Sequence, residues 1–187
     1  MTLAVTETTD IASIEACVAR PAAFIQQSTS LDGRGEFDLH IPLRHAGRHS
    51  VRARWQRAGN PDAPAVVVQG GISADRNACT SNDVATPGWW NAQIGAGRAL
   101  DPNSRHIVSI DWLGADGLLD APIDTADQAD AIAATLDHLR IATIEAFIGC
   151  SYGALVGLQF AVRHSSRLRK LVAISGAHRP PPYASAL

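Results

Sequence analysis

The amino-acid sequence predicts an α/β fold built around a largely parallel sheet, and three observations lead to this prediction. Short, continuously apolar runs bounded by turn residues recur along the chain, as expected of strands buried on both faces. Between the later runs lie segments whose apolar residues have helical spacing. The resulting order of strand, helix, strand, helix and strand is typical of right-handed βαβ units in an open parallel sheet.

The sequence of the first part of the chain predicts an N-terminal arm followed by a β-hairpin. Residues 1–30 show weak periodicity and are interpreted as an N-terminal arm, in which only Ile11–Ala19 suggests a short helix. Phe37–Leu43 and Val51–Trp55 then alternate apolar and polar residues, and Gly47 between them suits the turn of an antiparallel hairpin.

The hairpin segment is rich in arginine, which raises the alternative of a nucleic-acid patch. The period-2 alternation already places Arg52 and Arg54 on a solvent-exposed face, so the hairpin interpretation is favoured. The chain as a whole has a net charge of −2 and 5% aromatic residues, which gives neither a basic surface nor a stacking platform for nucleic acid.

The remaining elements follow from apolar runs and helical spacing. The expected strands are Ala65–Val68, His106–Ile110, Ile144–Ile148 and Leu171–Ile174, and the expected helices are Asp124–Leu139 and Tyr152–His164. For the first helix, Thr125 is the expected N-cap, with Gln128 as its capping-box partner.

Composition narrows the class of protein further. Hydrophobic residues make up 46% of the chain, enough for a packed core, and no apolar run is long enough for a membrane helix. The three cysteines are scattered, without zinc-ligand spacing, and the N-terminus lacks the pattern of a signal peptide. Asp75, Asp83 and Asp111 lack His or Cys partners. We therefore expect no metal, no permanently bound cofactor, no membrane partner and a cytoplasmic protein.

The most informative motif is Gly149-Cys150-Ser151-Tyr152-Gly153, a GxSxG pattern that lies between a predicted strand and a predicted helix. This context is typical of a nucleophile elbow, in which a serine occupies a strained turn and small flanking residues let strand and helix approach. The helix N-terminus places N–H groups and a positive dipole end beside the serine oxygen. Ser151 is therefore the predicted nucleophile.

An oxyanion hole requires two backbone donors. The N–H of Tyr152, directly after the serine, is one expected donor. The second is expected from the loop after Ala65–Val68, where Gly70 and Gly71 leave the backbone accessible; Gly71 is assigned this role.

The histidine base and its acid are expected to follow the serine, in the order Ser, Asp/Glu, His. No Asp or Glu follows Ser151 in this sequence. His164 closes the predicted second helix, where a cation is favourable, and His178 has no acid downstream of it. Acid and base are therefore expected not to lie in this chain, which would be inactive alone.

Several stretches resemble the homoserine O-acyltransferases of the α/β-hydrolase superfamily. They are Gln69-Gly70-Gly71-Ile72-Ser73-Ala74, Gly88-Trp89-Trp90, Ile94-Gly95-Ala96-Gly97-Arg98-Ala99-Leu100-Asp101, Asp111-Trp112-Leu113-Gly114-Ala115 and the serine motif. The glycine-tryptophan and Ile-Gly-x-Gly-x-Ala-Leu-Asp stretches are the more specific ones, because ordinary esterases do not carry them. Members commonly have His-x-Leu-Thr-Gly where this chain has Gln69 to Ser73.

The resemblance implies the N-terminal portion of an α/β-hydrolase fold: a hairpin leading into a parallel sheet with flanking helices. Residues 31–187 would form this part of the catalytic domain, ending where the family's lid begins, with the lid and the C-terminal strands absent. It also implies acyl transfer from acetyl- or succinyl-coenzyme A to the hydroxyl of L-homoserine, in methionine biosynthesis, through an acyl-serine. Acyl-coenzyme A would be a co-substrate, and the full-length protein a homodimer candidate.

Two alternatives remain open. In a serine esterase or hydrolase of the same fold, water would replace homoserine; in a non-catalytic fragment, a second chain would complete the fold. Arg76 and Arg98 are candidate partners for a substrate carboxylate or a coenzyme A phosphate, although surface ion pairing explains each equally well.

Overall fold

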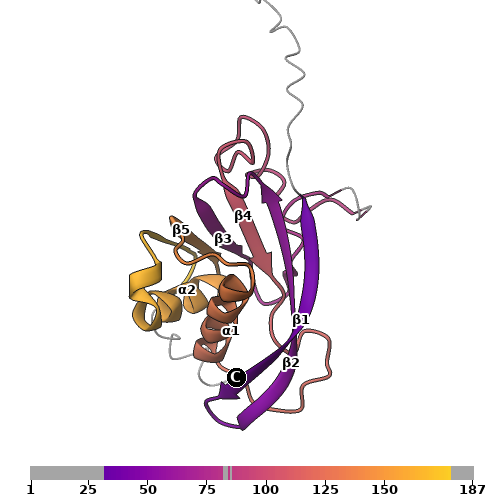
Figure 1. Cartoon of the computed structure of the whole chain (residues 1–187), viewed down its shortest axis with the longest axis vertical. Coiled ribbons are helices and arrows are strands. Elements are labelled where there is room, and N and C mark those ends of the chain that lie inside the picture. Colours follow the sequence, from indigo (N-terminus) through magenta and orange to yellow (C-terminus); the bar gives the residue numbers. More distant parts are fainter. Residues whose placement is uncertain (1–31, 82–83, 85, 178–187) are drawn as a thin grey trace, which may run out of the picture.

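A computed structural model describes residues 32–81, 84 and 86–177 of the chain. The expected arm over residues 1–30, including Ile11–Ala19, and His178 lie outside the described residues. The described part contains a six-stranded sheet with the strand order β1-β2-β4-β3-β5-β6 (Figure 1). The strands are β1 (Gly33–Leu43), β2 (Gly47–Gly59), β3 (Ala65–Gln69), β4 (His106–Ile110), β5 (Ala146–Cys150) and β6 (Leu171–Ile174).

The sheet is mixed, as the sequence predicts. β1 and β2 form an antiparallel hairpin, and β2 pairs antiparallel with β4. From β4 onward, the pairs β4–β3, β3–β5 and β5–β6 are all parallel. The carboxyl ends of these four strands therefore meet at one edge of the sheet, where ligands bind in open α/β sheets.

The hairpin is longer than expected from the alternating runs. Its turn spans residues 44–46 and ends at Gly47, the first residue of β2, where φ is 73°, a conformation that glycine adopts without steric cost. On the solvent-exposed face, Arg52 forms ion pairs with Glu36 at 2.8 Å and with Asp38 at 2.8 Å. Arg54 pairs with Glu36 at 3.3 Å. These contacts agree with the interpretation of this face as the solvated face of a hairpin.

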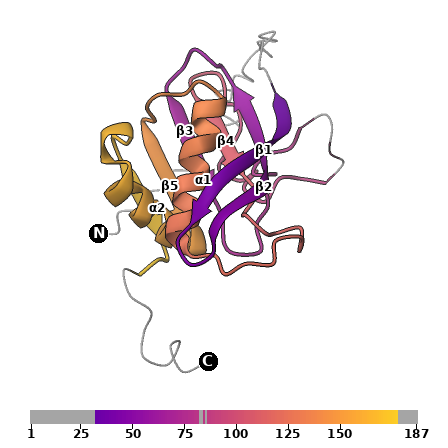
Figure 2. The ribbon, with the colours of Figure 1, turned by 60° about the horizontal axis from the view of Figure 1, so that its bottom comes forward.

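Two helices, α1 (Thr125–His138) and α2 (Tyr152–Arg163), cover one face of the sheet (Figure 2). They enclose a core in which Val67, Ile132, Leu136, Phe147 and Phe160 are almost completely buried. A short 3₁₀ helix, η3 (Ser165–Arg167), follows α2. Within the described residues, no helix is both long and apolar enough to cross a membrane.

The N-cap of α1 differs from the sequence prediction by one residue. Asp124, not Thr125, is the cap: its carboxylate accepts the N–H groups of Ala126 at 2.8 Å and Asp127 at 3.0 Å. The carboxylate of Asp127 accepts the Asp124 N–H in return and completes the capping box in place of Gln128. A carboxylate cap satisfies the same free N–H groups as a hydroxyl and also interacts favourably with the helix dipole.

The opposite face of the sheet is covered by the long segment between β3 and β4. Ala78, Cys79, Ile94 and Leu100 from this segment pack on apolar side chains of the central strands. The sequence Ile94 to Asp101 forms a closed loop in which Ile94 and Leu100 form a β-bridge. The carboxylate of Asp101 accepts the Gly97 N–H at 2.8 Å. This specific stretch of sequence therefore encodes a folded loop that anchors two apolar residues.

Candidate active site at the serine turn

Ser151 lies at the sharp turn between β5 and α2, at the carboxyl edge of the parallel strands. Its backbone has φ 54° and ψ −114°, a sparsely populated conformation for a residue with a Cβ. Its N–H donates to the Ile174 carbonyl of β6 at 2.8 Å, and its side chain is exposed. The strand–turn–helix context expected from the sequence is therefore present, with an exposed serine between β5 and α2.

The glycines of the motif allow the turn to be this tight. A Cβ on Gly149 would lie 2.2 Å from the Gly153 carbonyl oxygen, and a Cβ on Gly153 would lie 2.4 Å from the Gln69 carbonyl oxygen. Neither distance accommodates a carbon atom. Glycine at these two positions is thus required for α2 to approach both β5 and the end of β3.

The loop after β3 lies beside the serine. A Cβ built on Gly71 has the Ser151 Cβ as its nearest neighbour, at 3.9 Å. The Gly70 carbonyl accepts the N–H of Gly153, in the first turn of α2, at 2.9 Å. The N–H groups of Tyr152 and Gly71 donate no hydrogen bond within the described part of the chain. Two backbone N–H groups without an acceptor among the described residues therefore belong to residues next to Ser151 in the chain or in space.

The side chain of Tyr152 is partly buried against the core. Its ring meets Trp112 edge-on, with ring centroids 4.9 Å apart. Burial raises the pKa of the Tyr152 phenol, and a hydrogen bond with Gln128 partly offsets this effect. The phenol therefore stays protonated at neutral pH.

Arg76 and Arg98 are not brought together. Arg76, in the segment between β3 and β4, contacts Asp111, the residue that follows β4. Its backbone N–H donates to the Asp111 carboxylate at 2.7 Å, and its guanidinium lies 3.7 Å from the same carboxylate. Burial raises the pKa of Asp111, while the bonds from Arg76 oppose that rise. Arg76 is therefore an ion-paired residue near the serine edge.

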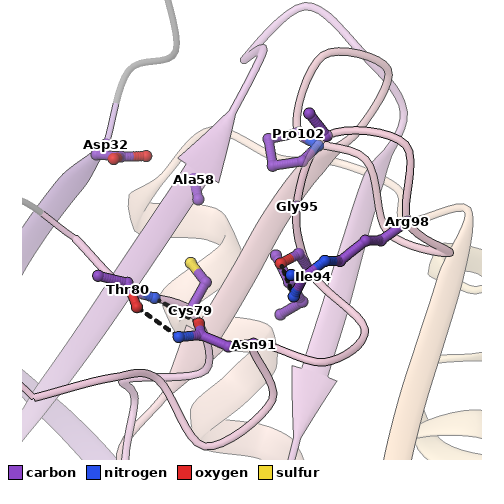
Figure 3. A pocket seen from close by; sticks show the side chains of 10 residues that line it. Asp32, Ala58, Cys79, Thr80, Asn91, Ile94, Gly95, Arg98 and Pro102 are labelled. Atoms are coloured by element: carbon purple, nitrogen blue, oxygen red, sulfur yellow. Dashed lines mark hydrogen bonds between the residues drawn. The ribbon is translucent and has the colours of Figure 1, made fainter. Parts of the chain in front are cut away.

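Arg98 lines a separate pocket of about 390 Å³. Figure 3 shows it beside Ile94 and Gly95, across from Ala58 of β2 and Asp32. Neither Ser151 nor Tyr152 nor Gly71 lines this pocket. No three metal-ligating side chains cluster among the described residues; Asp83 lies outside them.

His164 takes part in a cluster of charged side chains between the two helices. Its Nε2 lies 2.9 Å from the carboxylate of Asp130 on α1, which also binds Arg163 at 2.5 Å. Burial of Asp130 is outweighed by these two hydrogen-bond donors, so its pKa is lowered. This cluster joins α1 to α2, in agreement with the interpretation of His164 as a helix-end residue.

Sequence reasoning missed two side chains next to the serine, Gln69 and Trp112. Gln69 is 1% exposed and binds the backbone of Ile110. Trp112 donates its indole N–H to the Gly71 carbonyl at 2.9 Å. The available signal for Gln69 was a polar residue at the end of an otherwise apolar buried strand, which must find hydrogen-bond partners.

Comparison with known proteins agrees with this geometry. Residues 64–186 match the family model of the alpha/beta hydrolase fold. The chain is 59% identical over 153 residues to a homoserine O-succinyltransferase of Xanthomonas campestris, which covers 82% of this chain and 42% of the relative. It is 28% identical to an L-serine/homoserine O-acetyltransferase of Streptomyces lavendulae, over 78% of this chain and 44% of that protein.

Solved structures share the fold at lower identity. A homoserine O-acetyltransferase from Bacillus anthracis superposes with a TM-score of 0.74 at 17% identity, over 83% of this chain and 49% of that one. Esterase E22 superposes with a TM-score of 0.73 at 19% identity, over 83% and 50% of the two chains. The chain thus spans half or less of the length of these relatives. With its strand order, its serine turn and the match over residues 64–186, the chain belongs to the alpha/beta hydrolase fold family.

Proposed function

We propose that the complete gene product transfers an acyl group from acyl-coenzyme A to the hydroxyl of L-homoserine, with Ser151 as the nucleophile. The observation that carries the proposal is the serine turn, with two unpaired N–H groups beside Ser151. The 59% identity to a homoserine O-succinyltransferase favours homoserine as acceptor and a succinyl donor. Both substrates are small molecules, and the donor is a cytoplasmic metabolite, so we place the enzyme in the cytoplasm.

In the first half-reaction, the Ser151 Oγ attacks the thioester carbonyl carbon and the carbonyl oxygen becomes an oxyanion. The N–H groups of Tyr152 and Gly71 donate to this oxygen, which stabilises the transition state more than the substrate. The C–S bond then breaks and coenzyme A leaves as its thiol after taking a proton. An acyl-Ser151 ester remains.

In the second half-reaction, the homoserine hydroxyl attacks the acyl-Ser151 carbonyl and passes through the same oxyanion hole. The ester bond to Ser151 breaks, its Oγ regains a proton, and O-acyl-homoserine leaves. Proton transfer at Ser151 requires a base. The proposal assigns that role to no described residue, since His164 is held by Asp130 on the helix-packed side of the sheet.

The test measures coenzyme A release by the purified complete gene product, using a thiol reagent. Succinyl- and acetyl-coenzyme A are compared as donors, with L-homoserine, L-serine or no acceptor. We expect release beyond one equivalent per enzyme to require homoserine, and all release to disappear in Ser151→Ala. Ser166→Ala, which changes an exposed serine beyond α2, is the matched control and should keep full activity. Absence of Ser151-dependent release with every acceptor would contradict the proposal.

A hydrolase is the second candidate, and the structural likeness to esterase E22 favours it at the level of the fold. The two candidates differ only in what attacks acyl-Ser151. If water attacks as fast as homoserine, coenzyme A release and simple ester cleavage will not depend on the acceptor. That outcome would replace the transferase proposal with a hydrolase.

A further inference from the structure

We propose that Gln69 and Trp112 are positioning residues that hold the Gly70-Gly71 loop so that the Gly71 N–H faces Ser151. The proposal rests on the proposed function only in taking that N–H as an oxyanion donor. Both side chains connect the loop region after β3 to the end of β4, and neither contacts the reacting atoms. Their effect would therefore be on the precision of the oxyanion hole.

The side chain of Gln69 forms hydrogen bonds to β4 at the point where the backbone pairing between β3 and β4 has ended. The parallel register of these strands pairs Val67 with Val108 and goes no further. Beyond it, the Gln69 side-chain amide spans the gap: Nε2 donates to the Ile110 carbonyl at 3.1 Å, and Oε1 accepts the Ile110 N–H at 3.0 Å. The amide thus satisfies both backbone groups of Ile110 on this side and joins the ends of the two strands.

The backbone of Gln69 is fixed on its other side by β5 and α2. Gln69 pairs with Gly149 in the parallel ladder. Its carbonyl oxygen lies where a Cβ on Gly153 would come within 2.4 Å. Gln69 is therefore held between β4 and the serine turn, and the direction in which the chain leaves β3 is set at this residue.

Trp112 fixes the peptide that follows Gly71. Its indole N–H and the Ala74 N–H both donate to the Gly71 carbonyl, at 2.9 Å and 3.0 Å. The ring is 5% exposed and packs edge-on against Tyr152. Trp112 therefore contacts residues that carry both proposed oxyanion donors.

The planarity of the peptide bond links these contacts to the Gly71 N–H. The Gly70 carbonyl and the Gly71 N–H belong to one rigid trans unit and point in opposite directions. Because the Gly70 carbonyl accepts the Gly153 N–H at 2.9 Å, rotation of this unit would break that bond and turn the Gly71 N–H away. The side-chain bonds of Gln69 to Ile110 fix the residue before this peptide unit, and the bond from Trp112 fixes the Gly71 carbonyl after it. Both therefore restrict such a rotation.

The test uses two conservative variants of the complete gene product. Trp112→Phe keeps an aromatic ring against Tyr152 but removes the donor to Gly71. Gln69→Met keeps the length of the side chain but removes both bonds to Ile110. We expect kcat to fall about tenfold in each, less than on outright loss of an oxyanion donor, with KM values unchanged. Trp90→Phe is the matched control and should keep kcat, because Trp90 is a partly buried side chain packed against the core on the opposite face of the sheet.

Crystal structures of the two variants separate this proposal from the proposed function. If wild type shows no Ser151-dependent turnover, the proposed function fails, and the position of the Gly70–Gly71 peptide alone decides the present proposal. We expect this peptide to be rotated or displaced in Trp112→Phe. A peptide that keeps its place, or a kcat within twofold of wild type in an active enzyme, would overturn the proposal. If Gln69→Met does not fold, Trp112→Phe decides.

Discussion

Replacement of Gly149 by alanine should destabilise the fold strongly, because the serine turn has no room for one more carbon. The added Cβ would lie 2.2 Å from the Gly153 carbonyl oxygen and 2.4 Å from its carbonyl carbon. An ordinary contact requires about 3.5 Å, so α2 would have to move away from β5 by about 1 Å. Both colliding atoms belong to backbone, which cannot rotate out of the way as a flexible side chain can.

The expected cost is about 3 kcal/mol, the upper part of the usual range for overpacking. In a protein of about 150–250 residues, such a loss lowers the melting temperature by roughly 6–12 °C, and the shift is smaller in a longer chain. Chemical denaturation of the complete gene product, followed by circular dichroism, measures the loss in the free energy of unfolding. Gly71→Ala is the matched control: its Cβ meets nothing closer than 3.9 Å, and the change in the unfolded chain is the same. Equal stability of the two variants would refute the reasoning.

Three further predictions concern stability and reactivity. Because Ser151 has φ 54°, Ser151→Gly should be more stable than Ser151→Ala by about 1 kcal/mol in thermal denaturation, and equal stability would show that the turn is unstrained. Burial raises the pKa of Asp130, but hydrogen bonds from Arg163 and His164 outweigh that effect and lower it. The ionised Asp130 therefore stabilises the fold at pH values above the pKa of a carboxyl in the unfolded chain, and this stabilisation is lost as the pH falls through the pKa of Asp130 in the folded protein. The stability gap between wild type and Asp130→Asn should therefore narrow on acidification, and a gap that stays constant in a pH series of denaturation curves would contradict this. Burial raises the pKa of Cys79 to about 11, so its peptide should take up iodoacetamide at pH 8 only after unfolding, and labelling of the native protein, read by peptide mass, would contradict the burial.

The part of the fold that the sequence predicts well depends on local patterns. Apolar runs such as Val66–Val68 identify the parallel strands, and helical spacing identifies α1 and α2. The serine turn is predicted from five consecutive residues, Gly149 to Gly153, that lie between an apolar strand and an apolar helix. These features need no knowledge of distant contacts.

The features that sequence reasoning missed depend on distant contacts. The bond from Trp112 to Gly71 joins residues 41 positions apart, and Gln69 finds Ile110 across a similar interval. Asp124, which caps α1 in place of Thr125, also pairs with Arg44 of the hairpin at 3.0 Å. Such contacts appear only once strands distant in sequence are adjacent in the sheet.

The most direct test of the central claim is the mass of the tryptic peptide that spans residues 141–163 and contains Ser151. The complete gene product is incubated with succinyl-coenzyme A in the absence of homoserine, digested and fragmented in the mass spectrometer. We expect one succinyl group on Ser151, its loss on addition of L-homoserine with formation of O-succinyl-homoserine, and no label in Ser151→Ala. A peptide without the acyl group, or an acyl group on the neighbouring Cys150 that persists in Ser151→Ala, would contradict the assignment of Ser151 as the nucleophile.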